Sequence, residues 1–301
     1  MRGVRPNFFI VGAAKAGTTS MYEYLEQHPD VYMATLKEPH WFSRVRPNPS
    51  RRVRPVTSEE EYARLFDGWR GERAVGEASP SYLWDEETPR RIKQSVPEAR
   101  IIVLLREPVS RAFSHYLMDV YAGRQSLPFH EALKEDHANP EKGWGVSNLY
   151  VDLGLYCEQL RRYFECFGRE NVLVLFFEDV FSGEDGLMAA LETTLSFLGV
   201  EPTVEGIRYE KNYNPLTTPR NRLSRLIFDV PRLHRMGGKL LPEGWKHFMR
   251  ERLLLRRVEK PEADPRAVEF LSGIYEPEID CLRDLLGREL PWSLPKPRAK
   301  T

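Results

Sequence analysis

The residues best suited to chemistry lie in a short loop of small side chains near the N-terminus. Gly12 and Gly17 allow a tight backbone path, and Lys15 lies between them. The residues that could present backbone N–H groups or hydroxyls to a ligand are Ala16, Gly17, Thr18, Thr19 and Ser20. A loop of this kind before a helix directs several N–H groups at one point, where the helix terminus adds partial positive charge. The pattern therefore predicts a phosphate-binding site, with a ligand-free turn as the alternative.

The glycine spacing equals that of the nucleotide P-loop, but the residues that follow differ. A P-loop kinase or ATPase has Lys and then Ser or Thr directly after the second glycine. Here Thr18 occupies the lysine position and the lysine has moved inside the loop, to position 15. This difference argues against ATP chemistry, and it removes the usual metal-binding arrangement.

A second candidate group follows the clearest strand of the chain, residues 101–105. Arg106 ends that strand, and Ser114 lies on the next helix, off its apolar face. Ligands of open α/β sheets bind at the carboxyl ends of strands, and a guanidinium suits phosphate. Taken singly, Arg106 could instead form a surface salt bridge with Glu107 or Asp119, and the serine could be a solvated hydroxyl.

Short apolar strands alternate with amphipathic helices along the chain. The expected strands are 8–11, 74–76, 101–105 and 172–177. The expected helices follow the first loop and Pro108, and then cover 153–167, 187–198 and 271–286. The alternation predicts an α/β protein with a three-layer, P-loop-like fold, in which helices flank a central, mainly parallel sheet. At 301 residues and 41% hydrophobic content, we expect one domain over 1–301.

Three segments lack a regular apolar period. We interpret 43–58, rich in Arg and Pro, and 123–148 as loops, the second with at most one helical turn. Residues 206–263 are irregular and basic. The arginines of the first segment could bind an anion, although such a run is more commonly solvated; they are Arg44, Arg46, Arg51, Arg52 and Arg54.

Composition sets further limits. A formal net charge of +0 gives no global field toward nucleic acid or an anionic membrane. Cys157, Cys166 and Cys281 are too few and too scattered for a disulfide framework or a zinc site, so we expect reduced, mostly buried thiols. No His, Cys and carboxylate cluster has metal-ligand spacing. The apolar run 8–11 is too short for a signal peptide and no segment reaches the ~20 residues of a membrane span, so we expect a soluble, cytoplasmic protein.

Two segments resemble a known family. Residues 8–43, FFIVGAAKAGTTSMYEYLEQHPDVYMATLKEPHWFS, resemble the opening of sulfotransferases that use 3′-phosphoadenosine 5′-phosphosulfate (PAPS), particularly the bacterial and heparan-sulfate-type branch. RIIVLLREPVSRAFSHY, residues 100–116, resembles their 3′-phosphate segment, and the tail 276–292 resembles bacterial members. The resemblance covers most of the chain, least over 43–72 and 228–262. It implies transfer of a sulfuryl group from PAPS to a hydroxyl or amine of an acceptor, with release of PAP. The implied acceptor is a glycan, a lipid or a small-molecule product, and no metal is implied.

The resemblance also implies a role for each matched residue. Lys15 would contact the 5′-phosphosulfate and stabilise charge on the leaving phosphate, within a loop formed by Ala16 to Ser20. Arg106 and Ser114 would bind the 3′-phosphate. Residues 206–263 could cover the nucleotide, where Arg220 matches a basic loop of related enzymes.

A proton acceptor is the remaining requirement of the transfer. The segment Lys37–Phe42 resembles one that carries a glutamate base with a histidine two residues on. Carried over, Glu38 is the general base and His40 its partner or an acceptor contact. A glutamate is weakly basic near pH 7 unless its surroundings raise its pKa, and Trp41 and Phe42 could supply an apolar wall that does so.

Other interpretations of this segment stay open. Glu38 could be an ordinary loop carboxylate paired with Lys37, and His40 a structural histidine. His28 and His115 are rival bases, because cytosolic members of the wider family use histidine.

The segment from Glu77 to Tyr82 resembles a substrate-side segment of heparan-type enzymes in which a lysine follows the glutamate. Ala78 replaces that lysine, which argues against a highly anionic acceptor. Glu77 and Tyr82 could still line the pocket, and for Trp84 we favour core packing over stacking on a sugar or ring. Loops 43–58 and 123–148 are the expected acceptor side.

Two other functions remain possible from the sequence. One is an ATP- and Mg²⁺-dependent P-loop phosphotransferase, and the other is a non-catalytic nucleotide-binding module. The sequence identifies neither the acceptor nor the oligomeric state.

Overall fold

A computed structural model describes residues 4–48, 53–208, 217–219, 255–257 and 261–295. Its core is a five-stranded sheet in the order β2-β3-β1-β4-β5, in which all neighbouring strands are parallel. The strands are β1 (Phe8–Gly12), β2 (Val31–Met33), β3 (Ala74–Ala78), β4 (Arg100–Leu105) and β5 (Val172–Phe176). Every residue of β1 and β3 is buried, as expected for parallel strands covered on both faces. The predicted three-layer α/β fold is confirmed.

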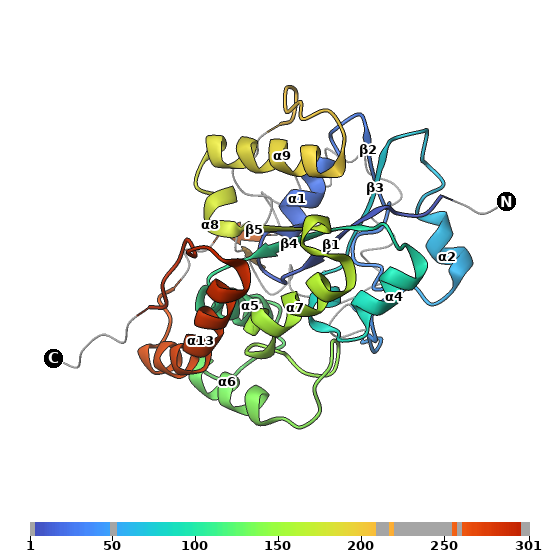
Figure 1. Cartoon of the computed structure of the whole chain (residues 1–301). Helices are drawn as coiled ribbons and strands as arrows, with labels where there is room; N and C mark the ends of the chain where they lie inside the picture. The colour runs from blue at the N-terminus through green and yellow to red at the C-terminus, as the bar shows by residue number, and fades with distance from the viewer. Residues whose placement is uncertain (1–3, 49–52, 209–216, 220–254, 258–260, 296–301) are drawn as a thin grey trace.

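Helices cover both faces of this sheet. Figure 1 shows α1 and α9 on one side and α4, α5 and α7 on the other. The longer helices are α1 (Thr18–Leu25), α4 (Thr88–Ser95), α5 (Pro108–Tyr121), α6 (Phe129–Ala138), α7 (Tyr156–Phe167), α9 (Glu184–Leu198) and α13 (Pro265–Leu286). The shorter ones are α2 (Glu59–Arg64), α3 (Ser81–Trp84), α8 (Phe177–Val180) and the 3-10 helices Asp152–Gly154 and Arg169–Asn171.

The strand order places three strand ends together. From the central β1 the chain moves to one side of the sheet through β2 and β3, and later to the other side through β4 and β5. The carboxyl ends of β3, β1 and β4 are therefore neighbours at the place where the strand order reverses, which is where open α/β sheets bind ligands.

The segment 123–148 differs from the prediction. It contains the ten-residue helix α6 instead of at most one helical turn. Phe129, Ala132 and Leu133 are buried on one face, and the Phe129 ring lies 5.0 Å from that of Phe113 on α5. Polar residues between these apolar positions obscure the helical period.

The other expected loop, 43–58, has no helix or strand in its described part before α2 begins at Glu59. An isolated antiparallel bridge joins Asn48 to Val53. The loop also contacts residues 143–147: Arg46 N–H donates to the Trp144 carbonyl at 3.3 Å, and Asn48 Nδ2 donates to the Gly145 carbonyl at 2.7 Å. The two segments expected on the acceptor side are thus in contact.

Within 206–263, two short strands pair antiparallel, β6 (Thr217–Pro219) and β7 (Leu255–Arg257). Arg220, like Arg51 and Arg52, lies outside the described residues. No helix in the described part of the chain is long and apolar enough to cross a membrane.

The expectation of reduced cysteines is wrong. A disulfide joins Cys157 on α7 to Cys281 on α13, with the Cα atoms 5.9 Å apart, and only Cys166 is free. The two partners are 124 residues apart in sequence, so only the packing of α7 against α13 reveals the pairing. Cys157 is buried in that contact.

The disulfide makes a testable contribution to stability. Because it closes a loop spanning 124 residues, Cys281→Ala should lower the free energy of unfolding by about 2–4 kcal/mol, measured by urea unfolding without reductant. Thiol titration of the unfolded protein should find one free thiol in the wild type and two in the variant. Three thiols in the wild type would contradict the pairing, and Cys166→Ala serves as the matched control.

Candidate active site

The phosphate-binding loop and Arg106 meet in the structure. The loop follows β1, Arg106 follows β4, and Arg106 Nη1 donates to the Lys15 carbonyl oxygen at 3.1 Å. This contact joins the two segments that the sequence predicted as separate anion sites.

The backbone of the loop has the form of an anion cradle. Lys15 and Gly17 adopt φ of 70° and 91°, and Met21 N–H is the donor to the Gly17 carbonyl that opens α1. The N–H groups of residues 17–20 precede that bond, so they belong to the helix terminus that lacks intrahelical partners. A Cβ on Gly17 would lie 2.4 Å from Phe181 Cε2, so only glycine fits there.

Lys15 places its ammonium in a largely dehydrated position. Its Nζ lies 3.6 Å from the Met118 sulfur on α5. Burial lowers the pKa of Lys15, and the neighbouring Arg106 lowers it further, while Glu38 acts in the opposite direction. Two cations close together and poorly hydrated favour an anionic ligand between them.

Arg106 is held by the elements around it. Its guanidinium carbon lies 4.2 Å from the centre of the Phe177 ring, and its backbone carbonyl accepts from Tyr156 O–H at 2.9 Å. Burial lowers the pKa of Arg106, and Glu178 opposes that change. Its Nε is buried without a hydrogen-bond partner among the described residues.

The carboxylates considered as salt-bridge partners of Arg106 have other contacts. Glu107 accepts from the Val109 and Ser110 N–H groups and caps α5. Asp119 lies 3.2 Å from Arg124 Nε. Ser114 is half-buried two turns into α5, off its core face as predicted, and its contact with a 3′-phosphate stays a prediction.

The candidate base lies beside His40. Glu38 Oε2 is 3.8 Å from His40 Nε2, and Lys37 Nζ is 2.5 Å from Glu38 Oε1. The Glu38 side chain is 40% exposed, and both Glu38 and His40 have left-handed backbones, with φ of 64° and 54°. The structure thus contains both the Glu38–His40 pair and the Lys37 ion pair that the sequence left as alternatives.

The expected rise in the pKa of Glu38 is wrong. Burial acts to raise this pKa, but Lys37, His40 and Lys15 together outweigh it, and the pKa lies below the ordinary value. The Trp41 ring stacks on Tyr62 at 5.2 Å, and Phe42 packs in the core, so neither supplies the expected apolar wall. Glu38 is therefore ionised at neutral pH and able to accept a proton.

His40 is a buried, neutral histidine. Its side chain is 4% exposed and its Nδ1 lies 2.7 Å from Ser81 Oγ. Burial lowers its pKa to about 4, although Glu38 acts to raise it. Its Nε2 lies on the side of Glu38 at 3.8 Å, beyond hydrogen-bond distance, and the burial of the ring argues against direct contact with an acceptor.

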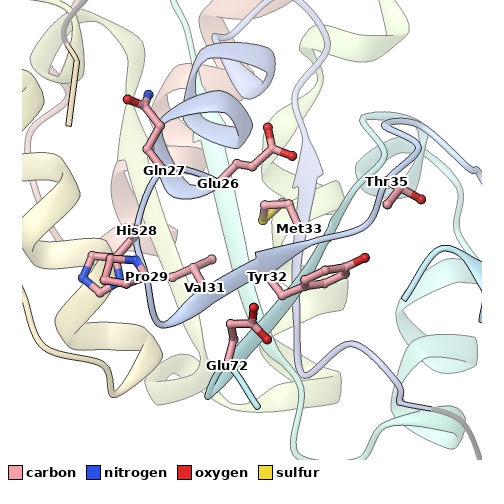
Figure 2. A pocket seen from close by; sticks show the side chains of 9 residues that line it. All are labelled: Glu26, Gln27, His28, Pro29, Val31, Tyr32, Met33, Thr35 and Glu72. Carbon is pink, nitrogen blue, oxygen red and sulfur yellow. The ribbon is translucent and has the colours of Figure 1, made fainter. Parts of the chain in front are cut away.

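The rival histidines lie in different surroundings. His28 Nδ1 accepts from the Asp30 N–H at 3.1 Å, and His28 lines a pocket at the β2 edge of the sheet (Figure 2). None of the residues of that pocket belongs to the phosphate loop or to 37–42, which disfavours His28. His115 Nε2 lies 3.9 Å from Asp119 Oδ2 on the same helix.

The structure corrects one prediction about the residues on the acceptor side and adds another residue near His40. Glu77 and Tyr82, expected to line the pocket, are both 0% exposed and cannot touch an acceptor. The Trp144 ring lies 5.7 Å from that of His40, a neighbour that sequence reasoning missed because no pattern links position 144 to position 40. Trp84 packs in a small apolar cluster with Trp144, in agreement with the core packing that the sequence favoured for Trp84.

Comparison with known proteins defines the family. Residues 5–217 match the model of the sulfotransferase domain, and the chain belongs to this family. It is 32% identical to a sulfotransferase of known crystal structure from Alicyclobacillus acidocaldarius. That likeness covers 95% of this chain and 98% of the other, with a TM-score of 0.72.

Curated relatives are more distant. Mouse (Mus musculus) carbohydrate sulfotransferase 15 is 28% identical over 253 residues, covering 66% of this chain and 45% of the relative. Mouse heparan sulfate glucosamine 3-O-sulfotransferase 6 is 31% identical over 201 residues, covering 66% and 54%. The chain spans about half the length of these curated relatives.

The buried His40 should titrate at low pH. We expect its ring signals in a two-dimensional NMR titration to show a midpoint near pH 4, because burial disfavours the charged form. Since the unfolded histidine binds a proton near pH ~6.5, this residue contributes stability above that pH, and the contribution is lost as the pH falls toward 4. A midpoint above 6 would contradict the burial. His40→Asn should remove this part of the pH dependence of unfolding.

Proposed function

We propose that this chain transfers a sulfuryl group from PAPS to a hydroxyl or amine of an acceptor and releases PAP. The observation that carries the proposal is the contact of Arg106 with the Lys15 carbonyl, which unites two anion sites. PAPS requires such a pair, because it has a phosphosulfate at its 5′ position and a phosphate at its 3′ position. Membership of the sulfotransferase family and the names of the relatives support the same conclusion.

The residues present fit this donor. The loop N–H groups of residues 17–20 and the Lys15 ammonium would hold the 5′-phosphosulfate, and Arg106 with Ser114 would hold the 3′-phosphate. The meeting of two half-buried cations, Lys15 and Arg106, in one site supports this assignment. When bound, PAPS supplies an activated sulfuryl group attached to a phosphate leaving group.

The remaining chemistry is assigned to three side chains. Glu38 would take the acceptor's proton at a carboxylate oxygen as the new S–O or S–N bond forms, and His40 would orient that carboxylate. Lys15 would stabilise the charge that develops on the leaving phosphate as its bond to sulfur breaks. The Coulombic coupling between Glu38 and Lys15 supports their placement around one reaction centre.

The acceptor class and location are also proposals. We propose a glycan, lipid or small-molecule acceptor that binds beside the contacting segments 43–48 and 143–147, next to the Trp144 ring. We also propose that the protein is cytoplasmic, as its sequence led us to expect. Alkylation of thiols in the cell tests this location, because a Cys157–Cys281 bond that persists there is typical of an oxidising compartment and would count against it.

Ligand-dependent thermal shifts separate the donor from ATP. PAP should raise the unfolding temperature by several degrees at saturating concentration, whereas ATP with Mg²⁺ should raise it little. The physical reason is the loop, which lacks the P-loop order of Lys followed by Ser or Thr. Stabilisation by ATP–Mg²⁺ but not by PAP would refute the proposal.

Replacing the base tests the chemical assignment. Glu38→Gln should lower kcat by about 10²–10⁴-fold, because the amide cannot take the acceptor's proton, and should leave PAP binding intact. The measurement is PAP formation from PAPS in an acceptor screen read by mass spectrometry. Glu165→Gln, an exposed change on α7, is the matched control.

Two results would count against this assignment. Full activity of Glu38→Gln would exclude Glu38 as the base. A wild type that binds PAP but sulfates no acceptor in a broad screen would favour the non-catalytic module.

A further inference from the structure

A buried carboxylate that the transfer does not use lies next to the base segment. Glu77, at the end of β3, is 0% exposed. Tyr62 O–H on α2 donates to its Oε2, and Ser79 O–H donates to its Oε1 at 3.0 Å. Burial raises the pKa of Glu77 to about 7, while hydrogen bonds from Tyr62, Tyr82 and Ser79 act in the opposite direction. A fully buried carboxylate with three hydroxyl neighbours is costly to keep and calls for a physical role.

The turn after Glu77 holds the base segment residue by residue. Glu38 N–H donates to the Ala78 carbonyl at 2.9 Å, and His40 N–H donates to Ser79 Oγ at 3.1 Å. Phe42 N–H donates to the Tyr82 hydroxyl oxygen at 3.2 Å. Every second residue of the base segment is therefore bonded to the turn.

These bonds hold an unusual backbone. Glu38 and His40 both have left-handed φ values, which residues with a Cβ rarely adopt. Such a conformation persists only where its surroundings enforce it. The enforcing groups here include the hydroxyls of Ser79 and Tyr82, each of which also faces Glu77.

The carboxylate sets the direction of these hydroxyls. The Ser79 hydroxyl donates its hydrogen to Glu77 Oε1, and the Tyr82 hydroxyl shares a hydrogen bond with the same carboxyl group. Their oxygen lone pairs are then available to the N–H groups of His40 and Phe42. An amide in place of the carboxylate would offer one acceptor oxygen and one donor group, and could not orient both hydroxyls in this way.

We propose that Glu77 is a positioning residue for sulfuryl transfer, acting through the Ser79 and Tyr82 hydroxyls to hold the Glu38 carboxylate and His40 in place. Its effect on turnover rests on the proposed function, whereas its effect on the backbone of residues 38–42 does not.

Amide hydrogen exchange tests the positioning without an acceptor. In Glu77→Gln we expect the His40 and Phe42 amides to exchange roughly tenfold faster, because their acceptors lose orientation. The Glu38 amide, bonded to the Ala78 carbonyl, should change less. Leu191→Ala, a cavity in the buried face of α9, is the matched destabilised control, because α9 contributes no residue to this network. Unchanged exchange at His40 and Phe42, or a uniform increase equal to that of Leu191→Ala, would overturn the proposal.

Kinetics test the consequence for transfer. Glu77→Gln should lower kcat by roughly 10–100-fold, with the KM for PAPS unchanged, because a small displacement of the base slows chemistry without touching the donor site. The readout is PAP release from PAPS, with the acceptor found by the screen or with water as acceptor. Equal changes in kcat and in the KM for PAPS, or an unchanged kcat, would overturn the positioning role.

A double-mutant cycle separates this role from general stability. If Glu77 acts through Ser79, Glu77→Gln should lower kcat much less in a Ser79→Ala background than in the wild type. Additive effects would overturn the proposed relay. Failure of the wild type to bind PAP would instead refute the proposed function, and the exchange experiment would still decide the positioning of residues 38–42.

Discussion

The contact between the Arg106 guanidinium and the Lys15 carbonyl is the constraint around which the site is arranged. It requires the end of β4 to lie beside the loop that follows β1, and parallel pairing of these two strands supplies that placement. The same contact brings two half-buried cations into one site, where burial lowers the pKa of both and Arg106 lowers that of Lys15 further. Folding thus places the positive charges before an anionic donor binds.

The acid–base side of the site is built differently from the donor side. The donor side relies on backbone N–H groups and fixed cations, whereas the base segment depends on side-chain hydroxyls from a neighbouring turn. Lys37 is the main charged group that lowers the pKa of Glu38, and the buried His40 beside it is neutral. In the proposed mechanism the ionised Glu38 is a base of modest strength, so its position has to contribute a large share of its effect.

Much of the fold could be predicted from the sequence because its signals are local. The apolar run before Arg106 and the small-residue loop around Lys15 need only their immediate neighbours to be recognised. Two of the errors share one cause, which is dependence on distant partners. Helix α6 depends on aromatic packing against α5, and the Cys157–Cys281 bond depends on how α13 meets α7. The pKa of Glu38 follows from a lysine that is adjacent in sequence, yet only the geometry shows that their charged atoms touch.

The contact between residues 46–48 and 143–147 has a consequence for how acceptor preference can change. Gly145 has φ of 84°, and a Cβ there would lie 2.3 Å from the Arg46 carbonyl oxygen. A side chain at position 145 would therefore collide with the other segment. If both segments contact the acceptor as proposed, grafts between family members would have to exchange them as a pair.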